Sequence, residues 1–188
     1  DHPVRTAPTR RAIERYTGVL YRELDAATLD PAARRRKRRD LLIVSGLWGL
    51  VAPSDPIPDY RLKMGARVEG LGTLSRWWRD PITAALEPRV RRAVVWDLLP
   101  NEHAAAVDWS RLQPARRVTV RFLDRRGQVV SHWNKLLKGS IVRWLLQGNG
   151  PDPEALADFA HPQGYVLDPA ATVVDGRHTA VVLREEPT

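Results

Sequence analysis

The sequence contains no cysteine and a single methionine among its 188 residues. Without cysteine, a disulfide framework, a cysteine-ligated zinc site and an iron–sulfur cluster are all excluded. No apolar run approaches the roughly 20 residues of a membrane-spanning helix. The longest one, residues 41–52, is interrupted by Ser45 and two glycines. We therefore expect a protein without a membrane span, and the lack of disulfides points to the cytoplasm.

Signals for metal and nucleophilic chemistry are weak. The five histidines are scattered, and no two share the spacing that places ligands on one helix face. A Ser–His–Asp triad from Ser131, His132 and Asp97 is formally available, but neighbouring strand residues point to opposite faces, so the adjacent serine and histidine cannot easily meet. We expect neither a metal site nor a cofactor.

Positive charge is abundant. The formal net charge is +8, and the cations are 26 arginines and only 4 lysines. Guanidinium groups stay charged and make two-pronged contacts with phosphate oxygens, so nucleic acid is the first partner to test. A GC-rich genome, which favours arginine codons, or an ordinary positive surface would give the same composition.

Strand and helix patterns alternate along the chain and predict an α/β (α+β) fold, with one mixed sheet of about five strands and flanking helices. We expect a single domain over residues 1–188, with residues 1–8 as a linker or the cut edge of a longer protein. Strands are expected over residues 41–44, 93–97, 117–122, 164–167 and 179–183, the second of them as an inner strand, and helices over residues 9–16, 19–24, 74–86, 134–147 and 152–159.

Several local signals refine this outline. Thr9 is expected to cap the first helix, and Asp30 to cap a helix that carries the basic block Arg34–Arg39. The proline-rich stretch Pro53–Pro58 predicts an irregular loop, residues 60–68 read as extended, and a break is expected near Pro81. Residues 128–133 are expected to return as a hairpin partner of the strand at 117–122.

The densest polar cluster follows that hairpin. Asn134, Lys135 and Lys138 fall on the first turn of a predicted helix, where free backbone N–H groups add to two ammonium groups. This pattern predicts an anion site. The alternative is a capping asparagine beside two solvated lysines.

A second cluster lies near the end of the strand at 93–97. Asp97, Glu102 and His103 follow one another where α/β sheets place their sites, and a carboxylate there can serve as a general base. A plain surface loop containing Pro100 explains them equally well.

Glycines mark a third feature. Gly70 and Gly72 flank an apolar residue just before a helix that carries Arg76. This pattern resembles the turn of helix–hairpin–helix DNA-binding modules, whose backbone amides hold a phosphate. An ordinary helix N-terminus accounts for the glycines as well.

Three separated motifs together resemble the YaaA family of bacterial peroxide-stress proteins. They are Tyr16–Gly18, the segment Ser45–Gly65 with its S-G-L-W-G and Y-R-L-K-M-G patterns, and the stretch from Ser131 to Gly139. The motif positions carried onto this chain are Tyr16, Thr17, Gly18, Ser45, Gly46, Gly49, Tyr60, Arg61, Gly65, Lys135, Lys138 and Gly139, with Glu102 as a looser match.

The resemblance implies a cytoplasmic protein of peroxide resistance and control of free iron. It also implies binding of double-stranded DNA in a positively charged cleft, with a helix–hairpin–helix element. Lining residues would be Arg61, Lys63, Gly70, Gly72, Arg76, Asn134, Lys135 and Lys138, and we expect Arg61 to converge with the two lysines.

Two other functions stay open. One is an enzyme acting on a nucleotide, a modified base or a small phosphorylated metabolite, with Arg61 and Lys138 on the anion and Lys135, Glu102 or Ser45 as catalytic candidates. The other is an interaction scaffold that uses the arginine block at 34–39.

Overall fold

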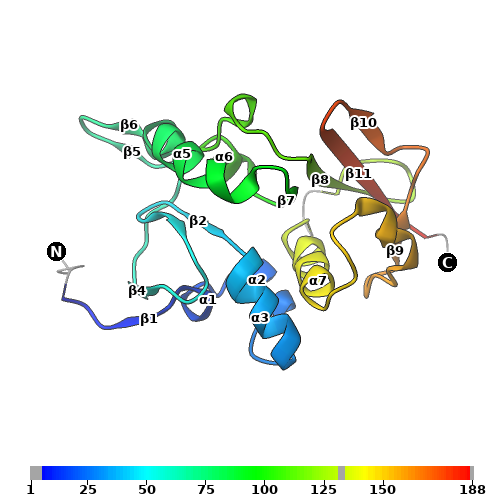
Figure 1. Cartoon of the computed structure of the whole chain (residues 1–188), viewed down its shortest axis with the longest axis horizontal. Helices are drawn as coiled ribbons and strands as arrows, with labels where there is room; N and C mark the ends of the chain where they lie inside the picture. The colour runs from blue at the N-terminus through cyan, green and yellow to red at the C-terminus, as the bar shows by residue number, and fades with distance from the viewer. Residues whose placement is uncertain (1–5, 131–133, 187–188) are drawn as a thin grey trace. The chain divides into compact units, whose positions relative to one another are not determined.

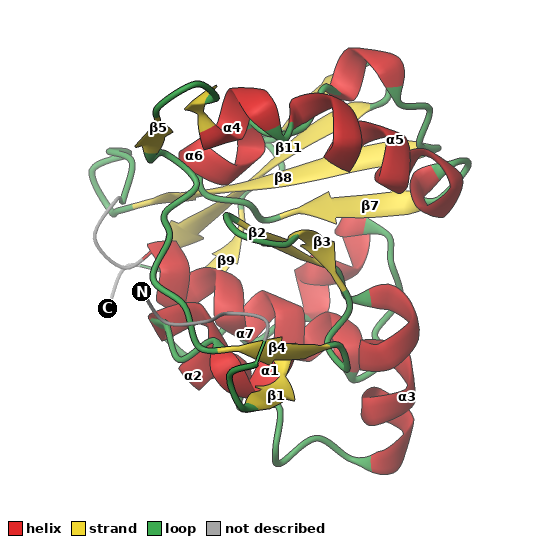
Figure 2. Cartoon of the chain, turned by 90° about the vertical axis from the view of Figure 1, so that its left-hand side faces the viewer, coloured by secondary structure: helices red, strands yellow, loops and turns green. Residues whose placement is uncertain are grey.

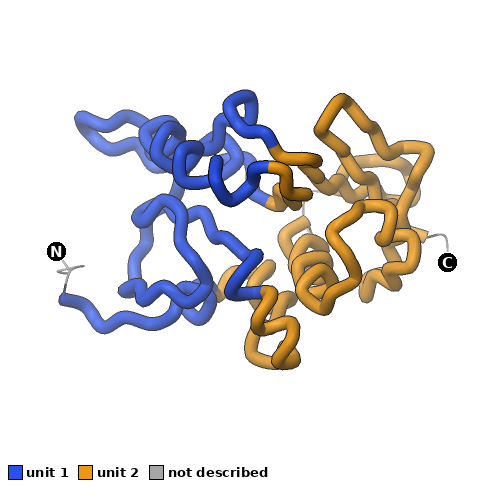
Figure 3. Tube along the Cα trace, viewed as in Figure 1, with its two compact units in different colours: residues 1–16, 37–91, 99–113 blue, residues 17–36, 92–98, 114–188 orange. Residues whose placement is uncertain are grey.

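The computed structural model describes residues 6–130 and 134–186, in which helices and strands are mixed along the chain (Figure 1). The chain divides into two compact units, each built from three stretches of sequence (Figure 3). Unit 1 comprises residues 1–16, 37–91 and 99–113, and unit 2 comprises residues 17–36, 92–98 and 114–188. The α/β (α+β) class is confirmed, and the assignment of all 188 residues to one domain stays a prediction.

Unit 2 contains the expected five-stranded mixed sheet (Figure 2). Its central strand β8 (Arg116–Leu123) runs parallel to β7 (Val94–Asp97) on one side and to β11 (His178–Glu185) on the other. Two short strands, β9 (Tyr165–Leu167) and β10 (Val173–Asp175), pair antiparallel with β11. Because β7 ends the strand order, the expectation that residues 93–97 form an inner strand is wrong. Its first three residues are accordingly only half-buried.

The core of unit 2 lies between the central strand of the sheet and one helix. Along β8, Val118, Val120 and Phe122 alternate onto one face and are buried, as the sequence predicts. They pack with Leu137 and Ile141 of helix α7 (Asn134–Leu146), which covers the sheet. Removing this apolar surface from water is the main stabilising contribution in unit 2.

Three further helical segments belong wholly or partly to unit 2. They are α2 (Val19–Leu24), which packs on α7, the first part of α3 (Pro31–Asp40), and the 3₁₀ helix η2 (Pro153–Asp158). The carboxylate of Asp30 accepts the backbone N–H of Ala33 at 2.8 Å. This confirms Asp30 as the N-cap of the helix that carries the arginine block.

Unit 1 is built from three two-stranded antiparallel pairs. Strand β1 (Thr9–Arg11) pairs with β4 (Pro56–Pro58), β2 (Ile43–Ser45) with β3 (Gly49–Val51), and β5 (Arg67–Val68) with β6 (Gly72–Thr73). Its helices are α1 (Ala12–Arg15), α4 (Leu74–Trp77), α5 (Arg79–Val90), α6 (Asn101–Ala104) and the 3₁₀ turn η1 (Trp109–Arg111).

Two local expectations for unit 1 are wrong. Thr9 does not cap a helix, because it begins β1, and Pro56–Pro58 is a strand rather than irregular loop. The two errors have one cause: residues 9–11 and 56–58 pair with each other, a contact between distant segments that local patterns do not reveal. The prolines are tolerated because this is a two-stranded pair with open edges.

The expected helix at 74–86 is interrupted at Trp78, between α4 and α5. Pro81 lies in the first turn of α5, where a missing N–H costs nothing. The expected hairpin return at 128–133 forms only a single bridge between Leu123 and Val129, and residues 131–133, including Ser131 and His132, lie outside the described residues.

Candidate functional site

Three hydroxyl groups form a hydrogen-bonded chain in unit 1. The Ser45 hydroxyl lies 2.5 Å from that of Tyr60, which lies 2.8 Å from that of Tyr16. Ser45 ends β2 and is buried, whereas both tyrosines are half-buried. These hydrogen bonds therefore join the Tyr-Thr-Gly motif to Tyr60 and, through it, to the first residue of the long middle motif.

The direction of the first of these hydrogen bonds follows from Ser45. Its oxygen accepts the backbone N–H groups of Leu47 at 3.3 Å and Trp48 at 3.1 Å. Since a hydroxyl has two lone pairs and one proton, the Ser45 proton is left to donate to Tyr60. Ser45 thus holds a tight turn and orients two phenols. This arrangement gives no support to Ser45 as a nucleophile.

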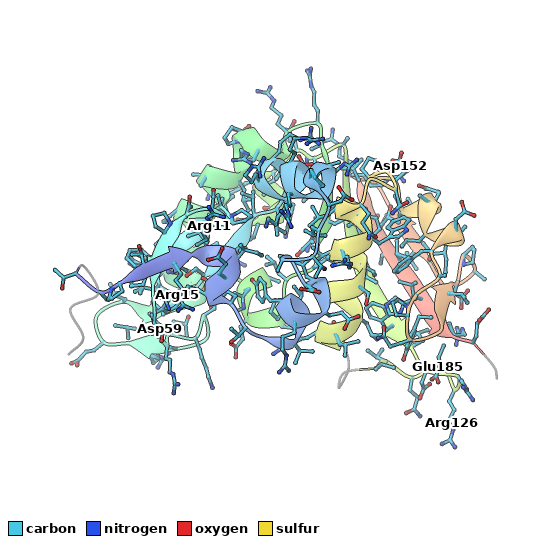
Figure 4. The ribbon with its side chains drawn as sticks, turned by 90° about the horizontal axis from the view of Figure 1, so that it is seen from below. Arg11, Arg15, Asp59, Arg126, Asp152 and Glu185 are labelled. Carbon is cyan, nitrogen blue, oxygen red and sulfur yellow. The ribbon has the colours of Figure 1, made fainter. Side chains whose placement is uncertain are left out.

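Arg15 fixes the backbone beside both tyrosines. Its guanidinium donates to the Ile57 carbonyl at 3.2 Å and to the Pro8 carbonyl at 2.7 Å. Figure 4 labels Arg15 together with Asp59, which follows β4 in the same unit. The segment before Tyr16 and the segment before Tyr60 are therefore tied together by a side chain as well as by β pairing.

Gly46 and Gly49 allow close packing within the middle motif. A Cβ at Gly46 would lie 2.6 Å from the Leu62 carbonyl oxygen. Gly49 has a φ of +71°, and a Cβ there would lie 2.6 Å from the Trp78 ring, whose N–H donates to the Gly46 carbonyl at 2.9 Å. Both glycines are thus required by contacts, so the S-G-L-W-G pattern has a structural role.

Gly65 lies against a carboxylate. A Cβ at this position would be 2.8 Å from the Glu102 Cδ, and Glu102 itself is exposed on α6. Gly65, the last residue of the middle motif, and Glu102, the looser motif match, are therefore direct neighbours. His103 is half-buried beside Glu102 in the chain.

Four basic residues belong to the two backbone segments that meet beside this glycine. Arg61, Lys63, Arg67 and Arg76 are exposed, and none of them makes an ion pair within residues 6–130 and 134–186. The backbone holds them together, because Leu74 N–H donates to the Ala66 carbonyl at 2.9 Å and Ser75 N–H to the Met64 carbonyl at 3.0 Å. We call these four residues the unit 1 cation cluster.

Gly70 lies in the turn between β5 and β6, and Gly72 is the first residue of β6; each has a φ of +77°. Residues 60–68 contain no helix, so the helix–hairpin–helix element does not form at this place. A β-hairpin precedes α4 instead, because left-handed glycines on both sides of Leu71 reverse the chain between two paired strands.

The Lys135–Gly139 motif lies in unit 2 at the start of α7. A Cβ at Gly139 would lie 2.6 Å from the Leu20 carbonyl oxygen, so the glycine lets α7 approach α2. The Ser140 hydroxyl donates to the Glu23 carboxylate at 2.8 Å. Gly18 precedes α2 as its N-cap residue, and Thr17 beside it is exposed. The second half of the Tyr-Thr-Gly motif and the third motif thus meet in one helix pair.

The three residues of the expected anion site at α7 differ in their exposure to solvent. Asn134 is the first residue of the helix and is half-buried, Lys135 is exposed, and Lys138 is half-buried. Burial lowers the pKa of Lys138 below its usual value, while the charge of Asp97 acts in the opposite direction. Asp97 is buried and paired with Arg117 at 2.6 Å, so it serves as a counter-ion rather than as a base.

The predicted residues divide between the two units. Unit 1 brings together Tyr16, Ser45, Gly46, Gly49, Tyr60, Gly65, Glu102 and the unit 1 cation cluster. Unit 2 contains Thr17, Gly18, Asn134, Lys135, Lys138 and Gly139. The expected convergence of Arg61 with Lys135 and Lys138 joins residues of different units and stays a prediction.

Sequence reasoning missed two contributors. Trp78 anchors the middle motif, and Glu23 connects α2 to α7 through Ser140. The tryptophan doublet at 77–78 beside two arginines was the available signal for the first.

Across the described ranges 6–130 and 134–186, no group of three or more His, Cys, Asp or Glu residues could hold a metal ion, and no helix there is long and apolar enough to cross a membrane.

Comparison with known proteins gives consistent matches. The family model described as "Peroxide stress protein YaaA" matches residues 2–171. The chain is 45% identical over 175 residues to a UPF0246 protein of Streptomyces coelicolor, covering 92% of this chain and 67% of the relative. It is 36% identical over 169 residues to a UPF0246 protein of Hahella chejuensis, covering 86% and 65%. The chain thus spans about two thirds of the length of these curated relatives.

Proposed function

Since this chain belongs to the YaaA family of peroxide stress proteins, we propose that it is a cytoplasmic protein that binds double-stranded DNA, largely independently of sequence, through a positively charged surface. The surface includes the unit 1 cation cluster. The same proposal includes a role for the protein in limiting free iron, alongside protection of the DNA.

The observation that carries this proposal is the state of the four cations in the cluster. They are exposed, and the ion pairs of unit 1 involve other residues, such as Arg11 with Glu14 and Arg39 with Asp40. Unit 1 also holds 15 Lys and Arg against 10 Asp and Glu, so most of the net charge of +8 lies there. Cations without acidic partners are available to phosphate oxygens.

Phosphate contacts give affinity without reading sequence, because every base pair carries the same backbone. Four neutralised phosphates predict that log K falls against log salt with a slope of about −3.6. Because this proposal assigns the affinity to phosphate contacts alone, two duplexes of unrelated sequence should bind alike.

Fluorescence anisotropy tests this proposal with two labelled duplexes of unrelated sequence at several salt concentrations. The double substitution Arg61→Gln with Lys63→Gln should weaken binding to both duplexes and reduce the salt slope by about 2. The matched control, Arg121→Gln with Arg126→Gln, removes two exposed arginines of unit 2 and should change neither slope nor preference. Absent or salt-insensitive binding by the unmodified protein would contradict the proposal.

A second candidate function is an enzyme on a nucleotide, a modified base or a phosphorylated metabolite. The contact between Gly65 and the Glu102 carboxylate favours it, because an exposed carboxylate fixed on a tight backbone can transfer protons. A thermal-shift screen with nucleotides would reveal a ligand, and Glu102→Gln and Lys135→Ala should then abolish turnover while Glu69→Gln does not. A screen without any stabilising ligand would remove the support for this candidate.

A further inference from the structure

Helix α4 exposes a tryptophan beside the unit 1 cation cluster. Trp77 is 43% exposed, which is high for a large apolar ring, and it directly follows Arg76 of the cluster. Arg79 follows two residues later and is also exposed. An exposed indole ring with two exposed arginines close to it in the sequence combines a flat apolar surface with groups that bind phosphate.

The ring is held from one side by its neighbour. Trp77 and Trp78 pack edge to face, with ring centroids 4.5 Å apart and an interplanar angle of 81°. Trp78 is itself fixed, because its N–H donates to the Gly46 carbonyl at 2.9 Å and its ring fills the space next to Gly49. Trp77 therefore rests on a rigid support and loses little side-chain entropy when a ligand covers its exposed part.

The surrounding backbone is equally well defined. Two backbone hydrogen bonds join residues 64–66 to the first turn of α4, so Lys63 and Arg67 approach the same short helix. Cations of the segment 63–67 and of helix α4 can then contact the phosphates on either side of a base that stacks on Trp77. Positive charge along the backbone path with an aromatic ring for the base is the arrangement that binds single-stranded nucleic acid.

We infer that Trp77 is a stacking platform for an unpaired base, so that this protein prefers DNA with a short single-stranded gap over intact duplex. This inference rests on the proposed DNA binding and deepens it. Inside a duplex both faces of each base are stacked on neighbours, so an indole ring can stack only on a base that has left the helix. The cation cluster binds any DNA, and Trp77 adds the preference for an exposed base.

The test compares a labelled duplex of about 20 base pairs with the same duplex carrying a gap of about four nucleotides, a length within single-strand site sizes. The unmodified protein should bind the gapped DNA about tenfold more tightly, as expected for one stacked base. Trp77→Leu should remove this preference while leaving affinity for the intact duplex unchanged. Trp77→Phe should retain part of the preference, because a smaller ring still stacks.

Trp48→Leu is the matched control. Trp48 is also an exposed tryptophan of unit 1, at 38% exposure, but it lies in the β2–β3 turn, and its loss should keep the preference. Unchanged affinity for intact duplex also shows that each variant is folded. Equal binding of both DNAs by the unmodified protein, or a preference that survives Trp77→Leu, would overturn the platform while leaving duplex binding in place. Failure to bind either DNA would overturn the proposed function together with this inference.

Discussion

The hydroxyl of Ser45 and the hydroxyl of Tyr60 are joined by a 2.5 Å hydrogen bond between residues that are 15 positions apart. Ser45 has already accepted two backbone N–H groups, so the bond runs from the serine to the tyrosine. Tyr60 in turn is hydrogen-bonded to Tyr16. Two motifs that are distant in the sequence are thus connected by side-chain hydroxyl groups.

Removing the centre of this chain should destabilise unit 1. Tyr60→Phe leaves the buried Ser45 hydroxyl without its acceptor and removes the hydrogen bond between Tyr60 and Tyr16, at a cost of about 1–3 kcal/mol. Tyr16→Phe removes only the end of the chain and should cost less. Urea unfolding followed by tryptophan fluorescence measures both. Equal stability of Tyr60→Phe and the unmodified protein would show that the chain contributes nothing.

Gly139→Ala should also destabilise the fold, against the usual preference of helices. In a helix interior this change normally stabilises by about 1 kcal/mol. Here the added Cβ would lie 2.6 Å from the Leu20 carbonyl oxygen, so α7 would have to move away from α2, at about 1–3 kcal/mol.

Gly18→Ala is the control for that substitution. Gly18 has a φ of −60°, and the nearest atom to an added Cβ is 3.9 Å away, so the change creates no clash and should cost at most about 1 kcal/mol, from the poorer N-cap alone. Thermal unfolding of both variants measures the difference. A Gly139→Ala protein at least as stable as the unmodified one would contradict the close approach of the two helices.

Stability should fall in mild acid because of His161. This residue is 5% exposed, its Nδ1 accepts the Gln163 N–H at 3.2 Å, and its other ring nitrogen faces the Leu137 carbonyl at 3.3 Å. These two bonds fix one neutral tautomer. Burial lowers the pKa of His161 below its usual value, against opposing effects from the hydrogen bond to Leu137 and from the charge of Glu23.

The sign of the pH effect follows directly. Above the unfolded pKa of about 6.5 the histidine is neutral in both states and its full contribution to stability is present. As the pH falls below that value, the unfolded chain takes up a proton that the folded chain does not, so stability declines by at most about 1.4 kcal/mol per pH unit. Urea unfolding of the protein and of His161→Phe at pH 7.5 and about pH 5.5 measures this decline. An equal decline in both would assign it to other groups.

How far the sequence predicts this molecule depends on the range of the interactions. The alternation at Val118, Val120 and Phe122 and the cap at Asp30 are local, and they are confirmed. The pairing of Thr9–Arg11 with Pro56–Pro58 was missed, because it depends on a partner far along the chain.

The same distinction holds for the candidate site. The motifs identified Ser45, Tyr60 and Gly65 as special positions, but not what each one contacts. Ser45 accepts two amide N–H groups, and Gly65 lies against Glu102. Both contacts are visible only in the three-dimensional structure. The tryptophan doublet marks Trp78 as an unusual position, but it does not reveal the carbonyl 32 positions earlier to which the indole N–H donates.

The most direct test of the whole account is the salt dependence of duplex DNA binding. Anisotropy titrations between about 50 and 200 mM salt, on two duplexes of unrelated sequence, should show affinity falling steeply and equally for both. The slope should become shallower by about 2 when Arg61 and Lys63 are replaced by glutamine. Affinity that does not change with salt, or no binding at low salt, would contradict the claim that this surface binds phosphate.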